Sequence, residues 1–180
     1  FVFWSMLFSC CLSHPSAMFQ KEAIEQIGGY DENIVRGEDY DLWHRLLQKR
    51  PRSIRSLPNI GLFRRKHPGS STSGCNSKKQ NSEAKTASLK AMQSTLLFDS
   101  SSEKKLDMRS VAVMKTPNDA ENLPEINNAA LRLVALEESC LHKCFETLTE
   151  REKNLIRLDC DARIGELATL AVSKFGRKAT

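Results

Sequence analysis

Two short motifs near the N-terminus contain the residues best suited to chemistry. Gly28 and Gly29 precede the sequence Tyr-Asp-Glu, and Glu38 and Asp39 open the sequence Glu-Asp-Tyr-Asp-Leu-Trp. Glycine allows positive φ and a close approach of the backbone to a ligand. Acidic side chains in the first turn of a helix are favoured in the ionised form by the helix dipole. A fixed carboxylate beside a glycine-lined crevice has the properties of a general base for a hydroxyl group.

Four motifs, in this order along the chain, resemble the C-terminal half of a family 2 glycosyltransferase domain of the GT-A fold. They are residues 14–19, the Gly-Gly-Tyr-Asp-Glu turn, the Glu-Asp-Tyr-Asp-Leu-Trp sequence, and Arg-Arg-Lys-His at 64–67. The resemblance covers roughly residues 4–74. It implies an α/β fold, namely an incomplete, Rossmann-like GT-A domain. Upstream of these motifs no βαβ unit with an Asp-x-Asp motif is visible, so we expect a fragment that holds the acceptor side of the active site.

The resemblance assigns roles to individual residues. Asp39 is the expected general base, and Glu38 shapes the site or contacts acceptor hydroxyls. In an inverting enzyme of this kind, the acceptor hydroxyl attacks a nucleotide-linked sugar while a divalent metal steadies the leaving diphosphate. His67 is the expected metal ligand, and Mn or Mg would bind only together with the missing Asp-x-Asp half. The expected substrate-binding residues are Gly28, Gly29, Asp41, Trp43, Arg64, Arg65 and His14.

Most of these candidates also have a structural interpretation. Asp39 can simply cap the helix that follows, which contributes about 1 kcal/mol. Gly28 alone would serve to end a helix. Trp43 shares an apolar helix face with two leucines, so it can pack in the core instead of stacking on a sugar ring. His14 can be a core residue, and a histidine beside proline, as at His67, is often structural.

Positive charge concentrates between residues 45 and 66, although the net charge of the chain is only +5. The basic residues are Arg45, Lys49, Arg50, Arg52, Arg55, Arg64, Arg65 and Lys66. One interpretation is a solvated helix end followed by an edge strand. The other is a surface that attracts diphosphate, an anionic acceptor or acidic lipid. The nucleic-acid signal is weak, because aromatic residues do not interleave with these charges.

The elements that would position these residues follow from periodicity and from turn residues. Strands are predicted at 5–19, 54–57 and 60–63, and helices at 21–27, 39–49 and 84–98. Two longer amphipathic helices follow residue 124, and Thr149-x-x-Glu152 is a capping box that opens the second. The predicted domains are a transferase-like part at 1–74, a flexible polar linker at 75–83 and a mainly helical extension at 84–180.

Composition is typical of a globular protein, with 40% hydrophobic and 27% charged residues. The apolar run at residues 1–12 is too short for a transmembrane helix, so no transmembrane segment is predicted in this chain. The six cysteines do not suggest a disulfide framework. The spacing Cys140-x-His142-x-Cys144 does not place three zinc ligands on one helix face. Reduced cysteines indicate the cytoplasm, or the cytosolic face of a membrane.

The leading hypothesis is an inverting, metal-dependent glycosyltransferase that is inactive as an isolated fragment. Its partners would be a nucleotide-sugar donor and a glycan, lipid, protein or nucleoside acceptor. An alternative is a non-catalytic helical interaction module that carries a vestigial transferase remnant. A third hypothesis, an anion- or RNA-binding adaptor, explains the basic cluster but neither the Gly-Gly nor the Glu-Asp motif.

Overall fold

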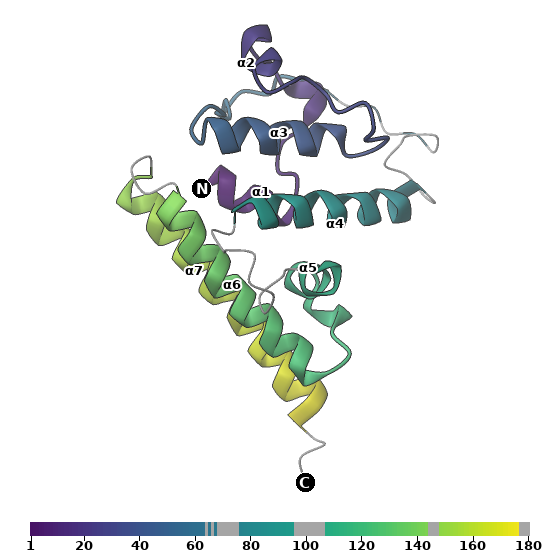
Figure 1. The fold of residues 1–180 in the computed structure, drawn as a ribbon, viewed down its shortest axis with the longest axis vertical. Coiled ribbons are helices and arrows are strands. Elements are labelled where there is room, and N and C mark those ends of the chain that lie inside the picture. Colours follow the sequence, from purple (N-terminus) through teal and green to yellow (C-terminus); the bar gives the residue numbers. More distant parts are fainter. Residues whose placement is uncertain (64, 66, 68–75, 96–106, 144–147, 177–180) are drawn as a thin grey trace. The chain divides into compact units, whose positions relative to one another are not determined.

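The computed structural model describes residues 1–63, 65, 67, 76–95, 107–143 and 148–176 (Figure 1). Within these residues every regular element is a helix and none is a strand. In chain order they are α1 (Val2–Phe8), η1 (His14–Ser16), α2 (Lys21–Glu25), α3 (Glu38–Lys49), α4 (Asn76–Thr95), α5 (Met108–Lys115), η2 (Pro117–Asp119), α6 (Leu123–Lys143), α7 (Glu150–Leu170) and η3 (Ala171–Phe175).

The predicted α/β, Rossmann-like fold class is therefore wrong. Part of the strand expected at 5–19 lies in α1, whose Trp4, Met6 and Leu7 are fully buried. A short run that is apolar on all sides suits a buried helix as well as a buried strand, and periodicity alone does not separate the two. The strands expected at 54–57 and 60–63 are irregular chain in the structure.

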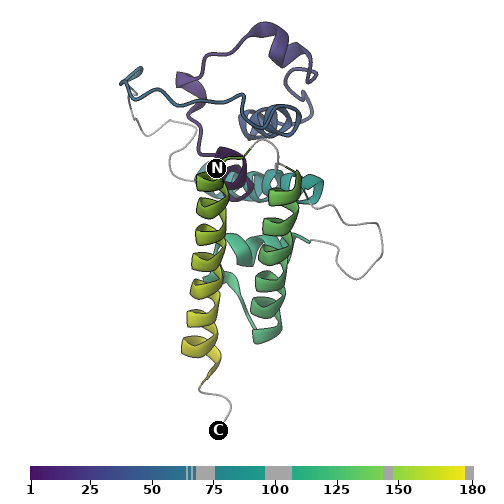
Figure 2. The same cartoon turned by 90° about the vertical axis from the view of Figure 1, so that its left-hand side faces the viewer.

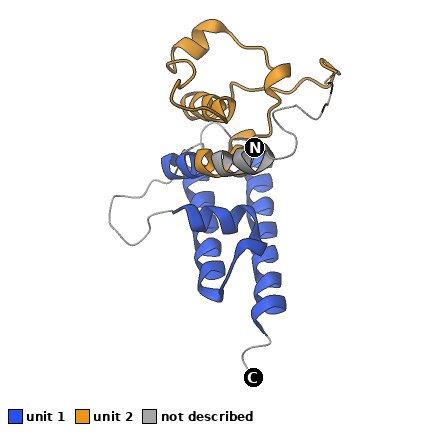
Figure 3. Ribbon diagram, turned by 90° about the vertical axis from the view of Figure 1, so that its right-hand side faces the viewer, with its two compact units in different colours: residues 1, 89–180 blue, residues 2–88 orange. Residues whose placement is uncertain are grey.

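The chain divides into two compact units (Figure 3). Unit 2 contains residues 2–88, and unit 1 contains residue 1 and residues 89–180. The boundary falls inside α4, which begins at Asn76. Residues 76–83 are thus helical where a flexible linker was expected, and the division into domains at 1–74 and 84–180 stays a prediction.

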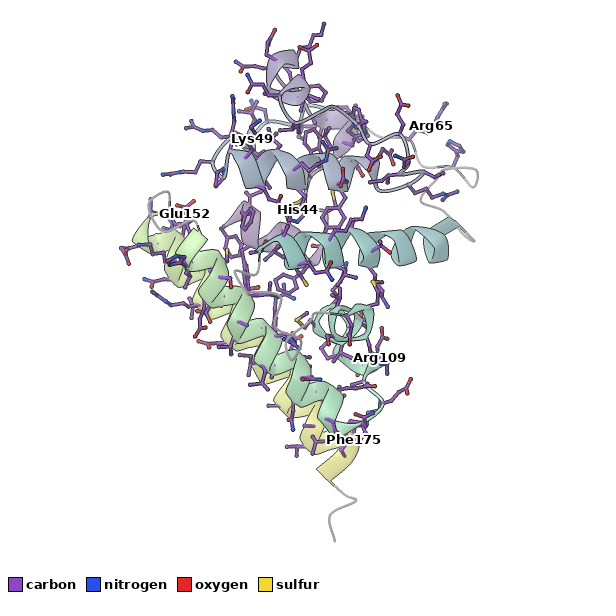
Figure 4. All side chains as sticks on the ribbon, viewed as in Figure 1. His44, Lys49, Arg65, Arg109, Glu152 and Phe175 are labelled. Carbon is purple, nitrogen blue, oxygen red and sulfur yellow. The ribbon has the colours of Figure 1, made fainter. Side chains whose placement is uncertain are left out.

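In unit 2, α3 packs against α1 through polar as well as apolar contacts. The hydroxyl of Tyr40 donates to the carbonyl oxygen of Met6, and Nε2 of His44 lies 3.1 Å from the same oxygen. His44 points from α3 toward α1 (Figure 4). Burial raises the pKa of Tyr40, so its phenol stays protonated and can donate this hydrogen bond. These bonds satisfy a carbonyl at the C-terminal end of α1 that has no partner within the helix.

In unit 1, α6 and α7 run side by side and α5 packs against α6 (Figure 2). The hydroxyl of Thr149 accepts the N–H of Glu152, and the carboxylate of Glu152 accepts the N–H of Thr149. The predicted capping box is thereby confirmed. Arg109 on α5 makes a two-point contact with Glu125 on α6, at 3.1 and 2.9 Å. The hydrogen bond from Arg109 lowers the pKa of Glu125.

Candidate functional site

The Gly-Gly turn closes α2 in a Schellman motif. The N–H of Gly29 donates to the carbonyl of Ile24, and the N–H of Gly28 donates to the carbonyl of Glu25, both at 3.0 Å. Both glycines have positive φ, +85° and +69° for Gly28 and Gly29, which this motif requires of its first residue. The two N–H groups are thus already engaged in the helix cap. A role for these glycines in substrate binding stays a prediction, and it would have to use other atoms.

Three basic residues at the end of α3 contact the same turn. Nη1 of Arg45 donates to the carbonyl of Ile27 at 2.7 Å, and Nζ of Lys49 donates to the carbonyl of Gln26 at 2.8 Å. Arg50 donates to the side chain of Gln26. Cations are favourable at a helix C-terminus, where they meet carbonyls without intrahelical partners. Three of the eight basic residues in the cluster therefore have a structural role, which is to fix α2 on α3.

The start of α3 presents the carboxylates singled out by the sequence. Gly37 is the N-cap residue, with φ of +77°, and Glu38 and Asp39 are the first two helical residues. Oδ1 of Asp39 accepts the N–H of Tyr40 at 2.8 Å. Asp41 forms an ion pair with Arg45, because its Oδ2 accepts a hydrogen bond from Nε of Arg45 at 2.7 Å. The side chain of Asp41 is 16% exposed. The structure therefore gives Asp41 an ion-pair partner, and its contact with substrate stays a prediction.

An aromatic cluster lies one helical turn beyond Asp39. Trp43 and Asp39 are four residues apart and so share a face of α3. The ring of Trp43 meets His14 and Phe19 edge-on, at 6.0 and 5.9 Å between centroids. Nε2 of His14 lies 2.8 Å from the hydroxyl of Tyr30, directly after the Gly-Gly turn. The structure therefore brings together His14, Trp43 and the Gly-Gly-Tyr motif, which are far apart in sequence.

The burial of Trp43 decides how this residue can act. Only 3% of Trp43 is exposed, so its ring faces are covered by neighbouring side chains and belong to the core. Its Nε1 atom is buried and has no hydrogen-bond partner among the described residues. A buried donor of this kind is usually satisfied by a bound water or by a ligand. Tyr30, at 39% exposed, is the more accessible aromatic ring of the cluster.

Cys10 is a neighbour of Asp39 that the sequence did not indicate as part of a site. Desolvation of its thiol raises the pKa of Cys10 to about 11, and the nearby negative charge of Asp39 adds to this increase. The thiol donates to the carbonyl of Leu12. The sequence Cys10-Cys11 belongs to no motif that predicts a neighbouring carboxylate. The proximity of Cys10 to Asp39 therefore follows only from the fold.

The remaining candidates lie in or beyond the irregular chain after α3. Arg65 and His67 are exposed, whereas Arg64 lies outside the described residues. Cys144, from the Cys-x-His-x-Cys spacing, also lies outside them. Within the described part of the chain, no three His, Cys, Asp or Glu side chains are grouped to hold a metal ion. The role of His67 as a metal ligand stays a prediction.

The chain is similar to a protein named "Bifunctional glycosyltransferase pgtA" from Dictyostelium discoideum, with 27% identity over 184 residues. The alignment covers 96% of this chain and 24% of that protein, so the chain spans about a quarter of the relative's length. No protein-family model matches the chain, and no solved structure does. The similarity indicates a relation to glycosyltransferases in general. In the described residues, no helix has the length and apolar character needed to cross a membrane.

Proposed function

We propose that this chain supplies the acceptor side of a glycosyltransferase active site, with Asp39 as the general base. The observation that carries this proposal is the hydrogen bonding of the Asp39 carboxylate. Oδ1 is held by the N–H of Tyr40, while Oδ2 has no hydrogen-bond partner among the described residues. A base needs one fixed orientation and one oxygen that can receive a proton, and this side chain offers both.

The proposed step is a single displacement with inversion at the anomeric carbon of a nucleotide-sugar. The acceptor oxygen forms the new bond to that carbon, and the bond between the carbon and the diphosphate oxygen breaks. The nucleoside diphosphate leaves with the electron pair, and the acceptor proton passes to Oδ2 of Asp39. Glu38, which is half-buried beside Asp39, would orient the acceptor through its hydroxyls. Assignment to family 2 stays a prediction.

The aromatic cluster supports an acceptor that extends along α3. His14 and Tyr30 lie beside Trp43, one turn from Asp39. The partly exposed ring of Tyr30 offers an apolar face to the C–H groups of a sugar ring. The buried, unpartnered Nε1 of Trp43 would donate to an ordered water beneath this surface. We therefore assign His14 and Tyr30 to acceptor binding, and Trp43 to support of that surface.

Two substitutions at Asp39 separate catalysis from helix capping. Asp39→Asn keeps an oxygen that can accept the N–H of Tyr40, whereas Asp39→Ala removes both that oxygen and the base. Sugar transfer should be measured in the full-length protein with a panel of nucleotide-sugars and manganese. If Asp39 is the base, both variants lose turnover by a factor of about 10² or more. If Asp39 only caps α3, Asp39→Asn keeps the turnover of the wild type and Asp39→Ala loses stability.

A second candidate function is that of a helical interaction module. The alignment with the Dictyostelium protein runs through 96% of this chain and so includes helical unit 1 as well as unit 2. If the full-length protein binds no nucleotide-sugar, the interaction module becomes the preferred function. Nucleotide-sugar binding by the full-length protein therefore decides between the two.

A further inference from the structure

We infer that the irregular chain after α3 is a docking surface for an anionic phospholipid bilayer. We call residues 50–63 with Arg65 the basic-apolar segment. The inference is independent of sugar transfer, because it rests on charge and exposure outside the candidate site around Asp39. It also concerns attachment of the protein to a surface, which the proposed function does not address.

The charge around this segment has a single sign. From residue 42 to residue 82 the sequence contains neither Asp nor Glu, while Lys and Arg recur. Within the segment, the side chains of Arg52, Arg55 and Arg65 are exposed. A basic stretch without interspersed acids creates a positive potential that extends about a Debye length into the solvent. Such a potential attracts the anionic lipids of a membrane leaflet.

The same segment exposes large apolar side chains. Leu57 is 79% exposed, Ile60 is 80% exposed and Phe63 is 91% exposed. Single exposed apolar residues are common on soluble proteins, but a concentration of them in one stretch marks an interaction site. These residues lie in irregular chain with no helix or strand assigned, so no regular element of their own packs them. Apolar side chains flanked by arginine are the combination that inserts into the interface of a bilayer.

The start of the segment is fixed to the fold. Arg50 donates to the side chain of Gln26, and its carbonyl accepts the N–H of Ser53 at 3.0 Å. The chain therefore leaves α3 in a defined turn before it reaches the exposed apolar residues. In Figure 4, Arg65 lies toward the opposite end of unit 2 from Lys49. The segment therefore runs from the end of α3 near Lys49 to the region around Arg65.

A bilayer fits this segment better than a nucleic acid. Binding to single-stranded nucleic acid uses several aromatic rings on which successive bases stack. Phe63 is the only Phe, Tyr or Trp in residues 50–66. Leucine and isoleucine side chains gain little from stacking with bases but are well accommodated among lipid acyl chains. The exposed aliphatic residues therefore favour lipid as the partner.

The test is flotation of the 180-residue chain with phosphatidylcholine vesicles, with and without phosphatidylserine. We expect binding only when phosphatidylserine is present, and weaker binding as salt is added. Removal of each charge in Arg55→Gln and Arg65→Gln should lower the partition coefficient about fivefold. Phe63→Ser should lower it about tenfold or more, because the phenyl ring no longer leaves water. The double variant Arg157→Gln, Leu158→Ser makes the same kinds of change on exposed positions of α7 and should bind as the wild type does.

Several outcomes would overturn the inference. They are binding that does not depend on phosphatidylserine, an equal loss in the α7 control, or no effect of Phe63→Ser. A titration with fluorescently labelled single-stranded RNA covers the other anionic partner. Tight RNA binding that needs the arginines, together with absent vesicle binding, would assign the segment to nucleic acid. Circular dichroism of each variant establishes that the helices are retained, which we expect because the substituted residues are exposed and lie outside the helices of unit 2.

Discussion

Substitution of Gly28 tests whether the Gly-Gly turn is a helix cap that needs glycine. Gly28 has φ of +85°, a region in which a Cβ atom is strained by its own backbone. A Cβ added at this position would meet nothing within 4 Å, so packing does not contribute to the effect. The left-handed conformation costs a residue with a Cβ about 1–2 kcal/mol. Alanine offsets about 0.4–1 kcal/mol of this, because it has less conformational entropy to lose on folding.

We therefore expect Gly28→Ala to lower the free energy of unfolding of unit 2 by about 1 kcal/mol. Gly61 is the matched control, because its Cβ would also meet nothing within 4 Å and its φ is not positive. Gly61→Ala should leave the stability unchanged or raise it by up to about 1 kcal/mol. The two variants thus make the same chemical change with opposite expected signs.

Tryptophan fluorescence during urea unfolding is the appropriate assay. The sequence has two tryptophans, Trp4 and Trp43, and both are buried in unit 2. Their signal therefore reports the unit that contains the turn, even if unit 1 unfolds separately. Equal midpoints for Gly28→Ala and Gly61→Ala would refute the cap. A Gly28→Ala variant that is as stable as the wild type but inactive in sugar transfer would instead support a direct role of Gly28 in the site.

Three further predictions concern single contacts. Arg45→Met should lower the free energy of unfolding of unit 2 by about 2 kcal/mol, because it removes a charge-assisted hydrogen bond to Ile27 and the ion-pair partner of Asp41. Urea unfolding measures this decrease. Lys49→Met removes a more exposed cation and should lower the free energy of unfolding clearly less. Thr149→Ala should remove the capping box and lower the free energy of unfolding of unit 1 by about 1 kcal/mol, as measured by thermal circular dichroism. Thr169→Ala, within the same helix, is the control and should lower this free energy less. Cys10 should be alkylated slowly by iodoacetamide at pH 7 and faster as the pH rises toward its pKa of about 11, because the thiolate is the reactive form. Peptide mass spectrometry gives the rate of alkylation. Asp39→Asn should increase this rate, because the loss of a neighbouring negative charge lowers the pKa of Cys10.

Local sequence signals predicted local structure well in this chain. The helix expected at 39–49 is α3, the glycine pair ends α2, and Thr149 and Glu152 form the capping box. Each of these features depends on residues within a few positions of one another. The first turn of a helix, its cap and its apolar face are all encoded at such short range.

The fold class was predicted wrongly, and the long-range contacts of the candidate site were not predicted, because both depend on residues distant in sequence. The apolar runs at 5–19 and 54–63 satisfied the strand pattern, but a strand also needs a partner with which to form its hydrogen bonds. The described residues contain no such partner, and α1 is stabilised instead by contacts of Met6 with α3. The capping of α2 by Arg45 and Lys49 and the position of Cys10 near Asp39 are likewise long-range contacts. In the sequence, these residues belonged to a charge cluster and to an unassigned thiol pair.

The distribution of contacts along α3 limits where chemistry can occur in unit 2. Tyr40 and His44 hold α1, Arg45 and Lys49 hold α2, and Trp43 is enclosed by the aromatic cluster. In the first turn, Oδ2 of Asp39 accepts no hydrogen bond from the described residues, whereas Asp41 is paired with Arg45. We therefore expect Asp39 or its neighbour Glu38, rather than Asp41, to be the carboxylate that takes the acceptor proton. If Asp39→Asn and Glu38→Gln both keep full turnover while the helix remains folded, neither of the two is the base.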